Sequence, residues 1–267
     1  MIFTVGQNSG HYCAPNATYD ALVGRTPSKL SQRDLIGECG SALAKAGIRL
    51  IAYLPSHAPA RDHMAAERLR FTPAWDARAW GFKPEPLPGA EKTDERLSEA
   101  QRNWEAVIRE WSLRWGALVA GWWIDGCYFA DRMYRGTTEP NFASLNQALK
   151  SGNAASIVAF NGGTAEPFTP LTEWQDYTAG EVAGEFPVPY QWRPMSRFIN
   201  GCQLHVLSFL GQSWGLGPPR FSWAFVAGYT QELNHLGGVM TWDVAISGKG
   251  AIDRPLFDQL KRIGASH

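Results

Sequence analysis

Along most of this chain, short apolar runs of strand length alternate with segments whose apolar residues recur at helical spacing. The runs are hydrophobic on both faces, which is typical of parallel strands covered by helices. They occupy residues 2–5, 48–54, 118–124, 156–160, 203–210 and 239–244, with one weaker candidate at 182–186. This alternation predicts a single α/β domain over residues 1–267.

Polar side chains gather at or just after the ends of these runs. Neither GxGxxG nor GxxxxGK[ST] follows any run, which argues against an open sheet that binds dinucleotides or phosphates. In a (β/α)8 barrel all strand ends meet on one face, where the active site lies. We therefore expect a (β/α)8 TIM-type barrel whose catalytic face carries Gln7, Asn8, His57, Asp125, Asn161 and Asp243.

One long segment interrupts the alternation. Residues 58–97 contain five of the chain's prolines and show little periodicity. Long insertions of this kind in compact domains usually serve a function. We expect a loop excursion from the barrel, followed by a helix over residues 98–115 whose tryptophans face the core.

Composition excludes several partners. The 25 Lys and Arg residues balance 25 Asp and Glu residues, so the net charge is zero and the electrostatic case for nucleic acid or an anionic membrane is absent. No run approaches the roughly 18 apolar residues of a membrane span. The four cysteines form no CxxC pair and the six histidines form no HxH or HExxH pair, so we expect no metal and no cofactor.

Asp125 is the strongest candidate for chemistry. It ends the apolar run Gly121-Trp122-Trp123-Ile124, and Gly126 after it allows a sharp turn. A carboxylate in this place is suited to act as a nucleophile, a general base or a metal ligand, although a strand-end aspartate that caps the next loop is also common.

A glycosidase requires a second carboxylate. The two carboxyl groups lie about 5–5.5 Å apart in a retaining enzyme and about 6.5–9.5 Å apart in an inverting one. Glu181 is our choice for the acid/base residue, because an aromatic residue and a glycine precede it in a polar loop. The candidates in that stretch are Glu166, Glu173, Asp176, Glu181 and Glu185.

The segment Trp123-Ile124-Asp125-Gly126 resembles the Trp-Phe-Asp-Gly nucleophile motif of the α-L-fucosidases, glycoside hydrolase family 29. Residues 151–161 and 237–244 are similar to later passages of that family. The resemblance implies a retaining exo-glycosidase that acts on a terminal α-L-fucoside or a related sugar. In such an enzyme Asp125 is the nucleophile.

The other predicted site residues follow from strand-end position. Gln7, Asn8, His11, His57 and Asn161 are expected to hold sugar hydroxyls, and Tyr128 and Trp242 to offer aromatic surface to the sugar. The family's Lys-His-His-Asp-Gly-Phe run is replaced here by residues 6–11, Gly-Gln-Asn-Ser-Gly-His, which leaves the identity of the sugar open. The expected partner is an oligosaccharide or glycoside substrate.

The resemblance begins at residue 2, so the barrel is expected either to be complete or to lack its first β/α unit. A missing unit would expose strand edges and is compatible with a homo-oligomer. No signal peptide is visible: the chain as given would be cytoplasmic, whereas a longer N-terminus with a leader would make it periplasmic or secreted. Two alternatives stay open, a non-catalytic carbohydrate-binding barrel and a metal-dependent hydrolase.

Overall fold

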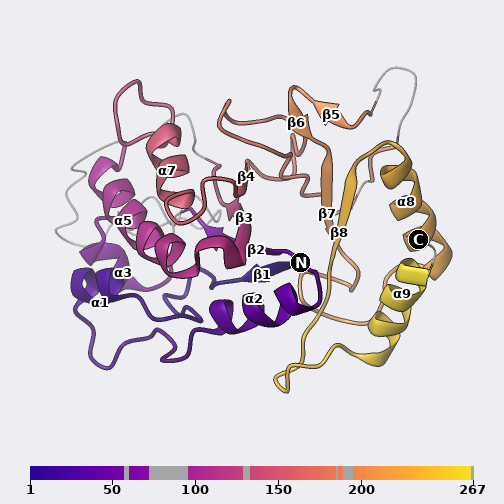
Figure 1. The fold of residues 1–267 in the computed structure, drawn as a ribbon, viewed down its shortest axis with the longest axis horizontal. Helices are drawn as coiled ribbons and strands as arrows, with labels where there is room; N and C mark the ends of the chain where they lie inside the picture. The colour runs from indigo at the N-terminus through magenta and orange to yellow at the C-terminus, as the bar shows by residue number, and fades with distance from the viewer. Residues whose placement is uncertain (57–59, 72–95, 129–132, 185, 189–194, 266–267) are drawn as a thin grey trace. The chain divides into compact units, whose positions relative to one another are not determined.

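The computed structural model describes residues 1–56, 60–71, 96–128, 133–184, 186–188 and 195–265. The chain divides into two compact units (Figure 1). The first unit contains Met1–Gly162 and Leu171–Gln175, and the second contains Gly163–Pro170 and Asp176–His267.

The first unit is built on a four-stranded parallel sheet in the order β1-β2-β3-β4. Its register places Pro55 opposite Asp125 and Ile124 opposite Phe160, so the carboxyl ends of β2, β3 and β4 are aligned at one edge. Side chains that follow these strands therefore meet there. The strands are β1 (Ile2–Thr4), β2 (Leu50–Pro55), β3 (Val119–Asp125) and β4 (Ile157–Phe160).

Five helices and one 3-10 turn of the described residues accompany this sheet. Asp34 caps α2: its carboxylate accepts the Gly37 N–H at 2.9 Å. The five helices and the 3-10 turn are α1 (Ala17–Val23), α2 (Leu35–Lys45), α3 (His63–Arg68), α5 (Ser98–Trp115), η1 (Gly116–Leu118) and α7 (Phe142–Leu149).

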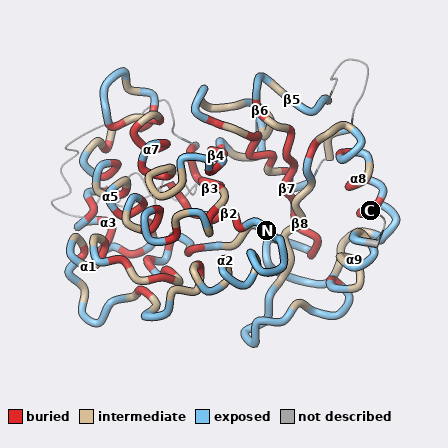
Figure 2. The backbone as a smooth tube through the Cα atoms, viewed as in Figure 1, coloured by how far each residue is buried: buried red, intermediate tan, exposed pale blue. Residues whose placement is uncertain are grey.

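The α5 helix confirms the prediction for residues 98–115 and for its tryptophans. Trp104, Trp111 and Trp115 are 2%, 0% and 2% exposed, and the rings of Trp111 and Trp115 stack at 5.9 Å. Each indole N–H finds an acceptor, which buried tryptophans require. Buried positions run along α5, α7 and β2–β4 (Figure 2), and α5 packs beside α7.

The second unit has a parallel pair and two covering helices. β7 (His205–Phe209) pairs with β8 (Val239–Asp243), and α8 (Trp223–His235) and α9 (Arg254–Ala265) follow these strands in the chain. A short antiparallel pair, β5 (Phe198–Ile199) and β6 (Cys202–Gln203), precedes β7.

An irregular extended segment over residues 176–182 runs parallel to β7 on its other side. Val182 N–H donates to Leu207 O at 2.9 Å and Leu207 N–H donates to Gly180 O at 2.8 Å. The weak strand predicted at 182–186 therefore lies some six residues too late, because the pairing segment is polar and contains a glycine with φ +68°.

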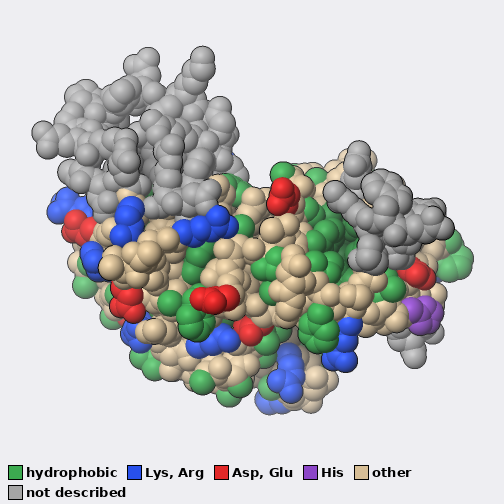
Figure 3. Space-filling view, turned by 90° about the horizontal axis from the view of Figure 1, so that it is seen from above, with side chains coloured by type: hydrophobic (Ala, Val, Ile, Leu, Met, Phe, Trp, Pro, Cys, Tyr) green, Lys and Arg blue, Asp and Glu red, His purple; other side chains and the backbone are tan. Residues whose placement is uncertain are grey.

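The parallel α/β class is confirmed, whereas closure into a barrel remains a prediction. Most of the excursion at 58–97 lies outside the described residues, and its described part includes α3. None of the helices in the described ranges is long and apolar enough to cross a bilayer. On the face shown in Figure 3, basic and acidic side chains are both present.

Candidate active site

The carboxylate of Asp125, the last residue of β3, lies at the carboxyl edge of the sheet and accepts four hydrogen bonds from described residues. Its Oδ1 receives Gly126 N–H at 2.7 Å, the Asn161 side-chain amide at 2.8 Å and the Tyr128 hydroxyl at 3.3 Å. Its Oδ2 receives the Tyr53 hydroxyl at 2.5 Å. The two oxygens are thus unequal: three donors fix Oδ1, and one donor faces Oδ2.

Tyr53 connects this carboxylate to the loop after β1. Gln7 Nε2 donates to the Tyr53 hydroxyl at 2.9 Å, and that hydroxyl donates to Asp125. Burial and then the negative charge of Asp125 raise the pKa of Tyr53 well above its ordinary value. The phenol therefore stays protonated and keeps its role as donor. Its ring stacks on Trp123, with 5.3 Å between centroids.

Strand register brings these groups together. Tyr53 lies directly opposite Trp123 in the β2–β3 pair, two positions before Asp125. Gly126 has φ +74°, a conformation that favours glycine, and turns the chain so that its N–H faces the carboxylate. Asn161 follows β4, is fully buried, and its backbone N–H donates to Ile124 O at 2.8 Å.

A buried ion cluster supports the loop after β1. Asp62 is 3% exposed and pairs with Arg25 at 2.8 Å and Lys29 at 2.5 Å, and Lys29 also donates to Ser9 O. Burial alone would raise the pKa of Asp62, but the hydrogen bond from Lys29, the Ala65 N–H and the two cations bring it below its ordinary value. The carboxylate is ionised and holds the loop.

The structure brings four predicted site residues of the first unit together: Asp125, Tyr128 and Asn161 directly, and Gln7 through Tyr53. Asn8 is buried in the same loop, and its side-chain oxygen has no hydrogen-bond partner among the residues that the structure describes. His11 is exposed, and His57 lies outside the described residues.

Tyr53 was missed by the sequence analysis. It lies inside a strand and not after one, so strand-end position did not select it. The signal that was available is its place one residue before the end of the run at 48–54, combined with the equivalent place of Trp123 in the run at 118–124. Parallel pairing makes such residues neighbours, but the relative register of the two strands cannot be read from either strand alone.

The remaining predicted site residues belong to the second unit. Glu181 forms a parallel bridge with Leu207 of β7. Trp242 donates its indole N–H to Thr230 of α8 at 3.0 Å and packs against Phe186. Asp243, at the end of β8, accepts the Gly215 N–H at 2.6 Å.

His205 in the same unit is a buried histidine whose ring nitrogens are both engaged. Nδ1 lies 3.1 Å from Thr178 O, so it carries the proton, and Nε2 accepts from the Thr241 hydroxyl at 2.9 Å. Burial lowers its pKa to about 4, and this ring is neutral at pH 7. Among the described residues no group of three His, Cys, Asp or Glu side chains is arranged to hold a metal ion.

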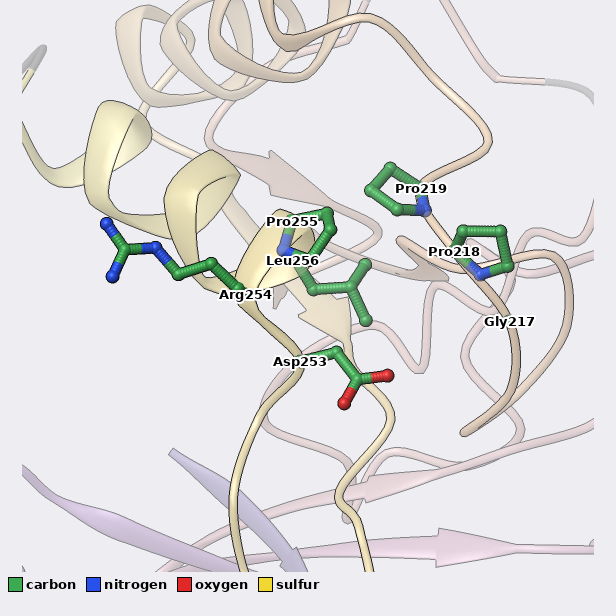
Figure 4. A pocket seen from close by; sticks show the side chains of 7 residues that line it. All are labelled: Gly217, Pro218, Pro219, Asp253, Arg254, Pro255 and Leu256. Carbon is green, nitrogen blue, oxygen red and sulfur yellow. The ribbon is translucent and has the colours of Figure 1, made fainter.

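A shallow hollow in the second unit lies beside the start of α9 (Figure 4). Its walls are mainly proline rings and Leu256, and the Arg254 guanidinium pairs with Asp258 at 2.9 Å. It brings no pair of carboxylates together. The lining residues are Gly217, Pro218, Pro219, Asp253, Arg254, Pro255 and Leu256.

The fold is similar to that of solved endo-fucoidan hydrolases and of a solved α-L-fucosidase. The endo-fucoidan hydrolases MfFcnA4 and MfFcnA9 of glycoside hydrolase family 107 are similar to this chain, with TM-scores of 0.72 and identities of 18% and 16%. These alignments cover 99% and 98% of this chain but 46% and 55% of those proteins.

The α-L-fucosidase AlfC from Lactobacillus casei, solved with α-L-fucose product, is similar with a TM-score of 0.61 and 15% identity, over 99% of this chain and 73% of AlfC. The expected resemblance to the fucosidases is thereby confirmed at the level of the fold. Neither the family sequence models nor the curated protein sequences give a match. The chain spans about half the length of the endo-fucoidan hydrolases that it resembles.

Proposed function

We propose that this chain is a glycoside hydrolase that cleaves an α-L-fucoside bond with retention, and that Asp125 is its nucleophile. The observation that carries the proposal is the held carboxylate at the end of β3, with three donors on Oδ1 and one on Oδ2. A carboxylate fixed at the carboxyl edge of a parallel sheet is what a double-displacement mechanism needs. The fold of the solved fucosidase and fucoidan hydrolases supports the choice of sugar.

In the first step, Asp125 Oδ2 would attack the anomeric carbon while the glycosidic C–O bond breaks. An acid, which we propose to be Glu181, protonates the departing oxygen. The product is an ester between Asp125 and the sugar. In the second step the same acid, now a carboxylate, removes a proton from water, and the water oxygen replaces Asp125 at the anomeric carbon.

Tyr53 has a defined part in these two reaction steps. Its hydroxyl orients Oδ2 in the resting state. When Oδ2 becomes an ester oxygen its negative charge disappears, and the phenol is released to interact elsewhere. Gln7, Asn8, His11, His57 and Asn161 remain our proposed contacts for the sugar hydroxyls, with Tyr128 and Trp242 as aromatic surface.

The preferred substrate is a terminal α-L-fucoside. Internal cleavage of a fucan chain is a second candidate, favoured by the higher TM-scores to the endo-fucoidan hydrolases than to the fucosidase. Release of aryl alcohol from 4-nitrophenyl α-L-fucopyranoside would indicate the first activity. A rapid fall in the length of a fucan polymer without release of fucose would indicate the second.

The decisive comparison is wild type against Asp125→Asn, with Glu99→Gln as a carboxylate-to-amide control at an exposed ion pair of the same unit. We expect Asp125→Asn to lower kcat by at least about 10³-fold and Glu99→Gln to leave it unchanged. Nuclear magnetic resonance of the first-formed anomer tests retention, and Glu181→Gln tests the acid. Undiminished turnover by Asp125→Asn would refute the nucleophile. Binding without any cleavage would favour the non-catalytic alternative, and activity lost to a chelator the metal-dependent one.

A further inference from the structure

An exposed tryptophan stands at the tip of a tight turn after β7. Gln212 N–H donates to Leu216 O at 2.9 Å and Leu216 N–H donates back to Ser213 O at 3.1 Å. This turn has Trp214 and Gly215 at its centre, and Gly215 takes φ +63°. The indole is therefore carried by a hydrogen-bonded turn and not by a loose loop.

A carboxylate from the neighbouring strand fixes the same turn. Asp243 Oδ2 accepts the Gly215 N–H at 2.6 Å, while Asp243 Oδ1 accepts no hydrogen bond from the described residues. Burial raises the pKa of Asp243 above its ordinary value. One oxygen of a partly buried carboxyl group is thus left available next to the tryptophan turn.

Phe209 supports the indole from below. Its ring meets the Trp214 ring edge to face at 4.9 Å, and the Arg220 guanidinium lies 3.5 Å from the centroid of the Phe209 ring. Arg220 is itself held by Phe209 O at 3.0 Å and Ala183 O at 2.7 Å. Trp214 nevertheless remains 37% exposed, and its indole N–H has no partner among the described residues.

The position of this group is the one expected for a ligand contact. Phe209 ends β7, Asp243 ends β8, and the two residues are directly paired. Ligands of parallel α/β structures bind outside the carboxyl ends of the strands. An exposed aromatic ring fixed in advance loses little conformational entropy when it binds. A ring face next to a free carboxyl oxygen and an indole N–H matches a sugar, which has an apolar C–H face and hydroxyl groups around its rim.

We propose that Trp214 and Asp243 form a saccharide-binding subsite of the second unit. The indole face stacks on a sugar ring, and Asp243 Oδ1 and the indole N–H bind its hydroxyls. The choice of a fucose-containing glycan as ligand rests on the proposed function. The subsite itself rests on the geometry of the turn.

Affinity electrophoresis through gels that contain fucoidan tests this inference on the full chain. The Asp125→Asn variant is the parent, so cleavage does not interfere. We expect Trp214→Ala in this parent to weaken retardation at least tenfold and Trp214→Phe to weaken it less. Trp223→Ala is the matched control, since Trp223 is an exposed tryptophan of the same unit with Arg262 over its ring. It should be retarded like the parent, and dextran gels should retard none of them.

Equal retardation of the parent and Trp214→Ala, or no retardation of the parent by fucoidan, would overturn the subsite. Melting temperatures of all variants identify any that fail to fold. If Trp214→Ala fails to fold, Trp214→Phe keeps the test valid. If wild type hydrolyses no fucoside but retardation still depends on Trp214, the proposed function fails and the subsite stands. If wild type hydrolyses the fucoside and retardation does not depend on Trp214, the subsite fails and the proposed function stands.

Discussion

Replacement of Tyr53 by Phe removes a single oxygen from the Asp125 cluster and leaves the ring stacked on Trp123. The hydroxyl that is lost donates to Asp125 Oδ2 at 2.5 Å, and the other three donors all lie on Oδ1. No other described group replaces it on Oδ2. A hydrogen bond to a charged acceptor contributes about 1.5–3 kcal/mol. We therefore expect about 2 kcal/mol of coupling between Tyr53 and Asp125.

A double-mutant cycle measures that coupling without any need for activity. The unfolding free energy in urea is determined at pH 7 for wild type, Tyr53→Phe, Asp125→Ala and the double variant. A parallel cycle with Tyr128→Phe is the control, because Tyr128 donates to the same carboxylate at 3.3 Å and is 36% exposed. Its coupling should stay below about 0.5 kcal/mol.

Two outcomes would contradict the hydrogen bond between Tyr53 and Asp125 Oδ2. Equal destabilisation by Tyr53→Phe in the presence and absence of Asp125 would show that the phenol acts through Gln7 or packing. The assigned hydrogen bond would then be refuted, together with the preference for Oδ2 as the attacking oxygen. A Tyr128 coupling as large as that of Tyr53 would also contradict it.

Two further perturbations follow from the charges. Asn161→Asp places a second carboxylate where an amide donates to Asp125 at 2.8 Å. The unfolding free energy at pH 7 should therefore fall by about 3 kcal/mol or more, and it should partly recover at pH 5, where the pair of carboxylates takes up a proton. Urea titrations at both pH values measure this change. His205 has a folded pKa of about 4 against an ordinary 6.5, so the stability it contributes is present above pH 6.5 and is lost as the pH falls toward 4, by about 3 kcal/mol. His205→Gln should flatten this part of the pH dependence, and an unchanged slope would contradict the assignment.

The local elements of the first unit were predictable because their signals are local. The run at 118–124 is apolar throughout, and Asp125 and Gly126 mark its end. The helix at 98–115 is set by its own spacing of tryptophans. The pairing of Tyr53 with Asp125 joins residues 72 positions apart and depends on strand register, so no local pattern contains it.

The second unit was less predictable for a related reason. The segment at 176–182 pairs with β7 although its own sequence is polar and irregular. Its backbone groups are satisfied partly by side chains, as when Val182 O receives the Ser208 hydroxyl at 2.6 Å. A propensity scale sees no strand there, because the partner strand supplies the stability. The Trp214 turn depends in the same way on Asp243, which lies 28 positions from Gly215.

The partners of two aspartates in the first unit distinguish a carboxylate that holds a loop from the one that we propose as the nucleophile. Asp62 is buried between Arg25 and Lys29, so its charge is neutralised by two cations and its role is to hold a loop. Among the described residues, Asp125 has only uncharged donors: two phenols, an amide and a backbone N–H. Neutral donors fix the position of a carboxylate without cancelling its charge. Under the proposed mechanism, a cation beside Asp125 would weaken the attraction between its carboxylate and an oxocarbenium-like transition state.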